Sequence, residues 1–166
     1  MHITREIAPD VHWVGVNDRR LERFENMFPI PGGVAYNSYL IRDEKTVLID
    51  TVDASVRDRF LENVEHTLAG RTLDYLVVNH MEPDHCGSIE EIVNRYGDVK
   101  LVGNKKTFSF FRQYYDLDID RNAVVVIDQE ELSIGKRVLR FYMAPMVHWP
   151  EVMFTMDRDN RILSSA

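Results

Sequence analysis

The 166-residue sequence contains a single cysteine, Cys86, and therefore cannot form an internal disulfide. A chain without disulfides fits a reducing compartment, so we expect a cytoplasmic protein. Cys86 directly follows a cluster of possible metal ligands and could itself be a thiolate ligand or a nucleophile. A lone cysteine beside a glycine is more often a small packed residue, and we favour that interpretation.

The sequence also lacks long apolar runs and an excess of positive charge. No run approaches the roughly 20 apolar residues of a membrane span, and residues 1–6 lack the pattern of a secretory signal. We therefore expect neither a membrane segment nor a signal peptide. The net charge of −7 disfavours nucleic-acid binding, because phosphate contacts need clustered lysine and arginine. The length and the apolar fraction of 45% are those of one globular domain.

Four possible metal ligands are present within six residues near the middle of the chain: His80, Glu82, Asp84 and His85. A β-rich apolar run at residues 73–78 precedes them, and a helix predicted at residues 88–96 follows them. Ligands on a loop between a strand and a helix can converge on one point. Carboxylates favour hard or borderline cations, and histidines suit iron or zinc. The alternative is a polar, solvated turn, but the fixed spacing favours a metal site.

Strand and helix patterns alternate along the rest of the chain, and residues 17–33 form an irregular loop in this prediction. The predicted strands are residues 4–8, 11–16, 36–42, 46–50, 73–78, 100–102, 123–127, 137–143, 152–156 and 161–163. Helices are predicted at residues 55–69, 88–96 and 104–115. Ser88 and Glu91 are expected to form a capping box at the start of the second helix. This pattern predicts an α/β or α+β fold with a mixed sheet faced by helices.

Two further groups of residues allow competing interpretations. Aromatic residues at 108–115 could stack on a flavin or a base, but their helical spacing favours core or a partner interface. His148 lies beside Trp149 in a loop between two predicted strands, where a histidine is more often packed or capping. A metal site needs ligands from separate elements, so the cluster at residues 80–85 makes His148 a candidate ligand.

The sequence resembles the metallo-β-lactamase-like domain of the flavodiiron proteins over essentially its whole length. The His-x-Glu-x-Asp-His motif at residues 80–85, preceded by Leu-Val-Val-Asn, is similar to the signature of that family. Residues 147–150, Val-His-Trp-Pro, match its next ligand segment, and residues 36–41 and 48–51 look like its early strands. The resemblance implies a metallo-β-lactamase-like αββα sandwich.

The resemblance also implies a set of ligands. His80, Glu82 and His148 would bind one iron ion, and Asp84 would contribute to a second. His85 would be either a ligand or a residue that donates a hydrogen bond to one. Metallo-β-lactamase hydrolases usually carry histidine at the position of Glu82 and bind zinc, whereas a carboxylate there favours iron. That carboxylate is typical of the branch of the superfamily that reduces oxygen and nitric oxide.

The family's domain continues beyond the equivalent of Ala166, where a bridging aspartate and a further histidine complete six ligands. An FMN-binding flavodoxin-like domain then follows. We therefore expect residues 1–166 to be the N-terminal two thirds of the β-lactamase-like domain, truncated before the domain ends. Exposed sheet surface should make this portion prone to association. Asp50 is expected to be either a structural residue near the site or a residue that contacts a metal ligand.

The implied activity is the reduction of O₂ to water, of NO to N₂O, or of both, at a non-haem diiron site with electrons from FMN. The FMN would come from the neighbouring subunit of a head-to-tail homodimer, and a rubredoxin- or flavoprotein-type donor would supply the electrons. Trp149 and residues 24–33 are candidates for surfaces near that FMN. Two alternatives stay open: a flavin-free, oxygen-binding diiron sensor, and a zinc-dependent hydrolase.

Overall fold

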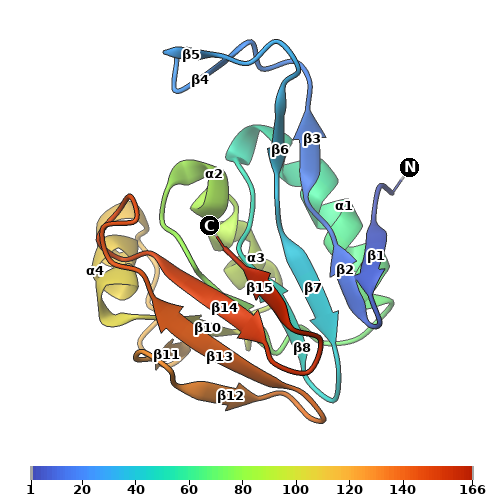
Figure 1. Cartoon of the computed structure of the whole chain (residues 1–166), viewed down its shortest axis with the longest axis vertical. Coiled ribbons are helices and arrows are strands. Elements are labelled where there is room, and N and C mark those ends of the chain that lie inside the picture. The colour runs from blue at the N-terminus through green and yellow to red at the C-terminus, as the bar shows by residue number, and fades with distance from the viewer. Residues whose placement is uncertain (1, 166) are drawn as a thin grey trace.

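The computed structural model describes residues 2–165, whose strands form two main sheets (Figure 1). The larger sheet has seven strands in the order β1-β2-β7-β8-β9-β10-β11. Their bounds are β1 (Arg5–Ala8), β2 (Val11–Trp13), β7 (Tyr39–Arg42), β8 (Thr46–Ile49), β9 (Tyr75–Val77), β10 (Lys100–Gly103) and β11 (Ala123–Val125). Neighbouring strands are antiparallel from β1 to β8 and parallel from β8 to β11. The predicted mixed sheet is confirmed.

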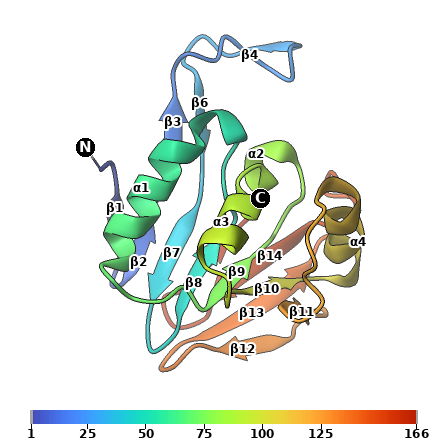
Figure 2. The same ribbon diagram turned by 180° about the vertical axis from the view of Figure 1, so that it is seen from behind.

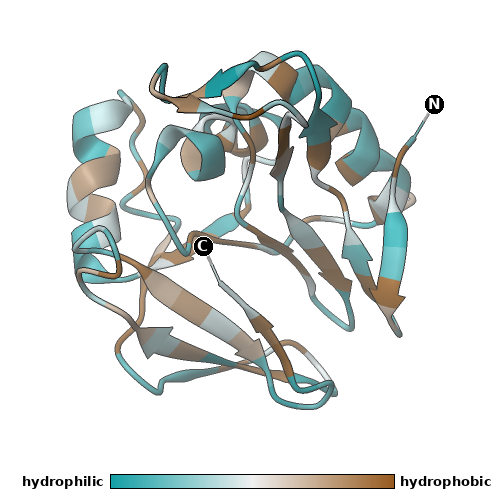
Figure 3. Cartoon of the chain, turned by 45° about the horizontal axis from the view of Figure 1, so that its top comes forward, coloured by the Kyte–Doolittle hydropathy of each residue, from teal (hydrophilic) through white to brown (hydrophobic). Residues whose placement is uncertain are grey.

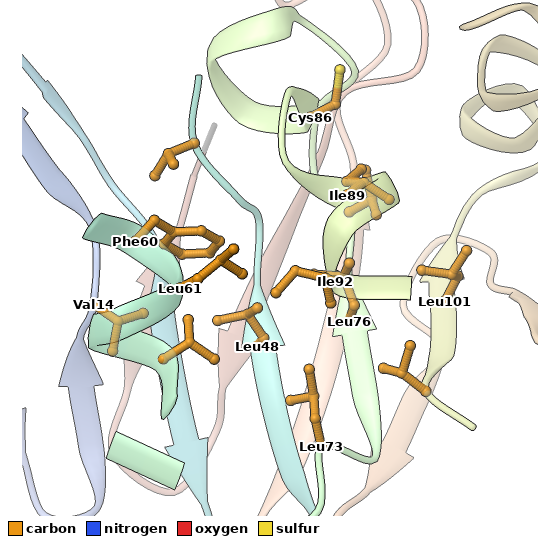
Figure 4. Close-up of a cluster of buried hydrophobic side chains, with 14 of the residues drawn as sticks. Val14, Leu48, Phe60, Leu61, Leu73, Leu76, Cys86, Ile89, Ile92 and Leu101 are labelled. Atoms are coloured by element: carbon orange, nitrogen blue, oxygen red, sulfur yellow. The ribbon is translucent and has the colours of Figure 1, made fainter. Parts of the chain in front are cut away.

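Helices cover one face of this sheet (Figure 2). They are the 3₁₀ turn η1 (Ala54–Val56), α1 (Arg57–Leu68), α2 (Pro83–Cys86), α3 (Ile89–Arg95) and α4 (Lys105–Tyr114). Val56, Phe60, Val64 and Leu68 recur every four residues, and all four lie in the core between helices and sheet. Figure 4 shows Phe60 in the same cluster as Leu48 of the sheet. The helix predicted at residues 55–69 is therefore confirmed as η1 followed by α1.

A smaller antiparallel sheet lies against the opposite face of the large one (Figure 1). Its strands, in spatial order, are β12 (Glu131–Ser133), β13 (Val138–Met143), β14 (Met153–Asp157) and β15 (Ile162–Ser164). The layers therefore run helix, sheet, sheet, which are three of the four layers of the expected αββα sandwich. Within residues 2–165, no helix covers the outer face of the small sheet (Figures 1 and 2).

The central strands of the large sheet are apolar on both faces because each face meets another layer. In β9, Leu76 packs into the cluster on the helical side and the next residue, Val77, packs into the cluster between the sheets. Leu139, Phe141 and Met153 contribute to that second cluster from the small sheet. The strand predicted at residues 73–78 is therefore present as β9, and its burial on both sides explains why the run is almost wholly apolar.

The outer face of the small sheet carries several apolar side chains. Tyr142 pairs with Phe154 across β13 and β14, and Met156 pairs with Leu163 across β14 and β15. Leu163 is 53% exposed, and Figure 3 shows apolar residues along these strands. The expected association of this portion of the domain through exposed sheet surface stays a prediction.

Three local predictions were wrong. Residues 17–33 are not wholly irregular: β3 (Val16–Asp18) pairs with β6 (Val34–Tyr36), and β4 (Arg23–Phe24) pairs with β5 (Phe28–Pro29) in a hairpin that projects from the body (Figure 1). The strand β12 was missed because only its middle residue is apolar. Ser88 does not cap α3, since its hydroxyl donates to the carbonyl of Val52 at 2.9 Å instead.

None of the helices within residues 2–165 combines the length and the apolar character that crossing a membrane requires.

Candidate metal centre

The loop that follows β9 is fixed near its start by Asn79, which is fully buried. Its backbone N–H donates to Asp50 Oδ1 at 2.7 Å, which ties the loop to the end of β8. Its side-chain oxygen accepts from Thr155 Oγ1 at 2.7 Å, and its side-chain nitrogen donates to the carbonyl of Ser164 at 3.2 Å. Asn79 thus joins the large sheet to β14 and β15 directly beside the possible ligands.

Three side chains from two loops converge next to this anchor. His80 and Glu82 come from the loop between β9 and α2, and His148 comes from the loop between β13 and β14. The atoms His80 Nε2 and Glu82 Oε2 are 3.0 Å apart, and His148 Nε2 lies 3.3 Å from the first and 2.9 Å from the second. His80 is fully buried, whereas the His148 side chain is 63% exposed, so the group opens to the surface on one side.

These separations suit a metal ion. When an ion makes bonds of about 2.1 Å, neighbouring ligand atoms lie about 3.0 Å apart in an octahedron and about 3.4 Å apart in a tetrahedron. The separations of 2.9, 3.0 and 3.3 Å lie within this range or close to its lower end. Two imidazole nitrogens and one carboxylate oxygen are also common ligand atoms of iron and zinc. His80, Glu82 and His148 could therefore hold one metal ion together.

The charge state of Glu82 suits the same role. Burial raises the pKa of this carboxyl, but the contacts with His148 and His80 outweigh burial and lower it overall. The adjoining Asp84 differs, because burial dominates and raises its pKa. The pKa of His85 is lowered by burial and raised by Asp50, Asp84 and Glu82, with a net increase.

A buried carboxylate that the sequence analysis missed lies behind His80. Glu151, at the end of the β13–β14 loop, is fully buried, and its Oε1 lies 2.7 Å from His80 Nδ1. The same oxygen accepts the backbone N–H of Met81 at 3.0 Å. Burial raises the pKa of Glu151, but the bonds from His80 and Met81 lower it overall. The only feature of the sequence that could have indicated a role for Glu151 was its position three residues after His148.

Comparison with known proteins agrees with this geometry. Residues 34–166 match the family described as "ODP family beta lactamase". The chain belongs to this family, the β-lactamase-like domain of the flavodiiron proteins. It is 35% identical over 158 residues to a nitric oxide reductase of Moorella thermoacetica, covering 95% of this chain and 39% of that protein. It is 33% identical to a flavo-diiron protein of Clostridium acetobutylicum, with the same coverage.

Solved structures of flavodiiron proteins have the same fold. The flavodiiron protein of Giardia intestinalis matches with a TM-score of 0.92 and 30% identity, over 99% of this chain and 40% of that one. Rubredoxin oxygen:oxidoreductase of Desulfovibrio gigas matches with a TM-score of 0.88 and 32% identity, over 98% and 40%. The metallo-β-lactamase-like fold prediction is thereby confirmed. The chain spans about two fifths of the length of these relatives.

The remaining residues of the flavodiiron motif lie close to the group of three but outside it. Asp84 Oδ2 is 3.8 Å from His85 Nε2, and Asp84 Oδ1 is buried without a hydrogen-bond partner among residues 2–165. His85 Nδ1 lies 3.4 Å from Asp50 Oδ2, an ionic contact without hydrogen-bond geometry. Asp50 therefore contacts both Asn79 and His85, which agrees with the structural role predicted for it.

Aromatic side chains enclose part of the centre. Trp149 packs edge-on against His80 with ring centroids 5.2 Å apart, and Phe110 packs against Trp149 at 6.2 Å. Phe108 and Phe111 lie in the core, as predicted for this helix, whereas Tyr114 is 47% exposed. The expected proximity of Trp149 to FMN stays a prediction.

Cys86 is a packed residue, as the sequence favoured. It is 2% exposed, and its Sγ donates to the carbonyl of Met81 at 3.2 Å. Burial raises the pKa of this thiol to about 11, so the thiolate is scarce at neutral pH.

Proposed function

We propose that this chain is the metal-binding part of a flavodiiron-type oxidoreductase that reduces O₂ to water, NO to N₂O, or both. The convergence of His80, Glu82 and His148 within 3.3 Å of one another is the observation that carries the proposal. The relatives named nitric oxide reductase and rubredoxin oxygen:oxidoreductase support both substrates. Glu82 supports iron over zinc, because carboxylate oxygen is a harder ligand than imidazole nitrogen.

In this proposal, His80, Glu82 and His148 hold one iron ion, and Asp84 contributes to a second. The unpartnered, buried Oδ1 of Asp84 supports that assignment, because buried oxygen atoms normally have a hydrogen-bond partner or a cation. When bound, the two ions would supply open coordination positions and electrons for O₂ or NO. In this proposal, His85 would be either a metal ligand or a hydrogen-bond donor to one.

The protein residues fix the reacting geometry. Reduction of one O₂ to two waters consumes four electrons and four protons, and conversion of two NO to N₂O and water consumes two of each. Trp149 packs on the ring of His80 and limits water access from that side. His148, whose side chain is 63% exposed within residues 2–165, forms the open side of the group.

The electrons would come from FMN in a flavodoxin-like domain outside residues 1–166, brought to the metal centre by the partner in a head-to-tail homodimer. Relatives named flavorubredoxins support a rubredoxin- or flavoprotein-type donor. Trp149 and residues 24–33 are the proposed surfaces near the flavin. The exposed Met27 and Phe28 at the hairpin formed by β4 and β5 agree with a contact surface there.

The test is metal analysis with Mössbauer spectroscopy on protein purified without oxygen, followed by O₂ and NO consumption with a reduced flavodoxin-like donor. Iron bound through His80, Glu82 and His148, lost in Glu82→Ala, supports the proposal. Iron without turnover would favour the flavin-free diiron sensor.

A zinc hydrolase is the second candidate, because two histidines and one glutamate also form catalytic zinc sites. Stoichiometric zinc, no iron, and hydrolysis of esters or thioesters would establish it and overturn the oxidoreductase. Purified protein that binds neither iron nor zinc would refute both proposals.

A further inference from the structure

Glu151 is a buried acid with few partners. Its carboxylate is fully buried, and its only hydrogen-bond partners among residues 2–165 are His80 Nδ1 and the backbone N–H of Met81. Both partners share Oε1, and Oε2 has none. A carboxylate without a neighbouring cation is costly to bury. A position of this kind calls for a function beyond packing.

The contact defines which nitrogen of His80 carries a proton. An ionised carboxylate only accepts hydrogen bonds, so Nδ1 of His80 must be the donor across the 2.7 Å contact. The Nε2 lone pair then faces Glu82 and His148, where the ligand atoms converge. Glu151 also fixes the rotation of the ring, because Met81 N–H anchors the accepting oxygen.

We infer that Glu151 is a positioning residue, which holds His80 with Nδ1 protonated and Nε2 directed at the metal. The inference rests on the proposed metal site and adds a residue to it. One loop, from β13 to β14, thus acts on both edges of the His80 ring: His148 meets Nε2, and Glu151 meets Nδ1. Asn104 steadies that loop, since its Nδ2 donates to the carbonyl of Glu151 at 2.6 Å.

Two variants separate the hydrogen bond from mere packing. Glu151→Leu removes the acceptor at similar volume, whereas Glu151→Gln keeps an oxygen that can accept from His80 and Met81. Asp157→Asn is the matched control, because Asp157 is a buried carboxylate on the adjoining β14, paired with Arg137 away from the site. Affinity for Fe²⁺ and Zn²⁺ is measured for each against a competing chelator.

We expect Glu151→Leu to weaken metal binding by about 10–100-fold, the usual effect of losing a partner of a metal-bound histidine. Glu151→Gln should stay within several-fold of wild type, and Asp157→Asn should leave the affinity unchanged while it lowers stability. Equal affinity in wild type and folded Glu151→Leu would overturn the inference. Equal losses in Glu151→Leu and Asp157→Asn would also overturn it, by showing a purely structural effect.

A spectroscopic measurement covers the case in which Glu151→Leu does not fold. In Zn²⁺-loaded wild-type protein with ¹⁵N-labelled histidine, His80 should show an Nδ1–H proton shifted downfield and protected from exchange. Binding of zinc through Nδ1 instead would refute the inference and leave the proposed function intact. Wild-type protein that binds neither metal would refute the proposed function and the inference with it.

Discussion

Two fully buried threonines allow the link between the sheets to be tested against an internal control. Thr155 Oγ1 donates to Asn79 Oδ1 at 2.7 Å, and neither residue is exposed. Thr107 is equally buried, but its hydroxyl has no hydrogen-bond partner among residues 2–165. Valine has nearly the shape of threonine, so Thr155→Val and Thr107→Val remove the same group from contrasting surroundings.

Thr155→Val should lower the free energy of unfolding by about 1–3 kcal/mol, because it removes one bond and leaves Asn79 Oδ1 buried without that donor. In a chain of this length, such a loss lowers Tm by roughly 2–12 °C. Thr107→Val removes a buried hydroxyl that has no partner. This change should leave the free energy of unfolding unchanged or raise it by up to about 1 kcal/mol.

Urea unfolding of the metal-free proteins, followed by circular dichroism, measures both effects. The midpoint should fall for Thr155→Val only, with an unchanged m value. The double variant Asn79→Ala/Thr155→Val should lose less free energy of unfolding than the two single variants lose in total. The reason is that the two residues share one hydrogen bond. Equal losses for the two threonine variants, or strict additivity with Asn79→Ala, would refute the argument that this bond joins the sheets.

Three further predictions concern the site and its surroundings. Glu82→His should shift the bound metal from iron toward zinc, measured by elemental analysis of purified protein; unchanged iron would contradict the role given to the carboxylate. Cys86 should resist a thiol reagent at pH 8 in native protein and react in urea, because it is buried with a pKa near 11. Burial raises the pKa of Asp43, but the N–H groups of Arg137 and Glu44 lower it overall. Its stabilising contribution should therefore exist above about pH 3.8 and vanish as the pH falls through the lowered folded-state pKa. Asp43→Asn should accordingly lose about 1–2 kcal/mol at pH 6 and little at pH 2, whereas equal losses at both values would contradict this.

The regular spacing of apolar residues correctly predicted the helices and strands that are buried. The four-residue repeat from Val56 to Leu68 and the apolar run at residues 73–78 each produce a surface that must meet another layer. The spacing of His80, Glu82, Asp84 and His85 likewise predicted a group of ligands. His148 was predicted separately, because strand ends bring their loops to one edge of a sheet. These features depend on side-chain type and period, which the sequence contains explicitly.

Features that depend on a partner far along the chain could not be predicted. Ser88 has the sequence of a capping residue, yet Val52, in the segment between β8 and η1, offers its carbonyl as the partner. Glu151 looks like an ordinary loop acid until folding places it 2.7 Å from His80, 71 residues earlier. Local sequence contains the capacity of each side chain to bond, and tertiary structure decides which partner it meets.

The candidate metal centre therefore depends on the stacking of the two sheets. His80 and Glu82 follow a strand of the large sheet, while His148 and Glu151 belong to a loop of the small one, and Asn79 ties the sheets together between them. Separating the sheets would destroy the site, so a metal that binds only the assembled group must stabilise their packing. At a free concentration one hundred times Kd, one bound ion would add about 2.7 kcal/mol to the free energy of unfolding. Because His80 contacts Glu82, His148 and Glu151, its replacement should abolish that added stability while most of the metal-free core is kept.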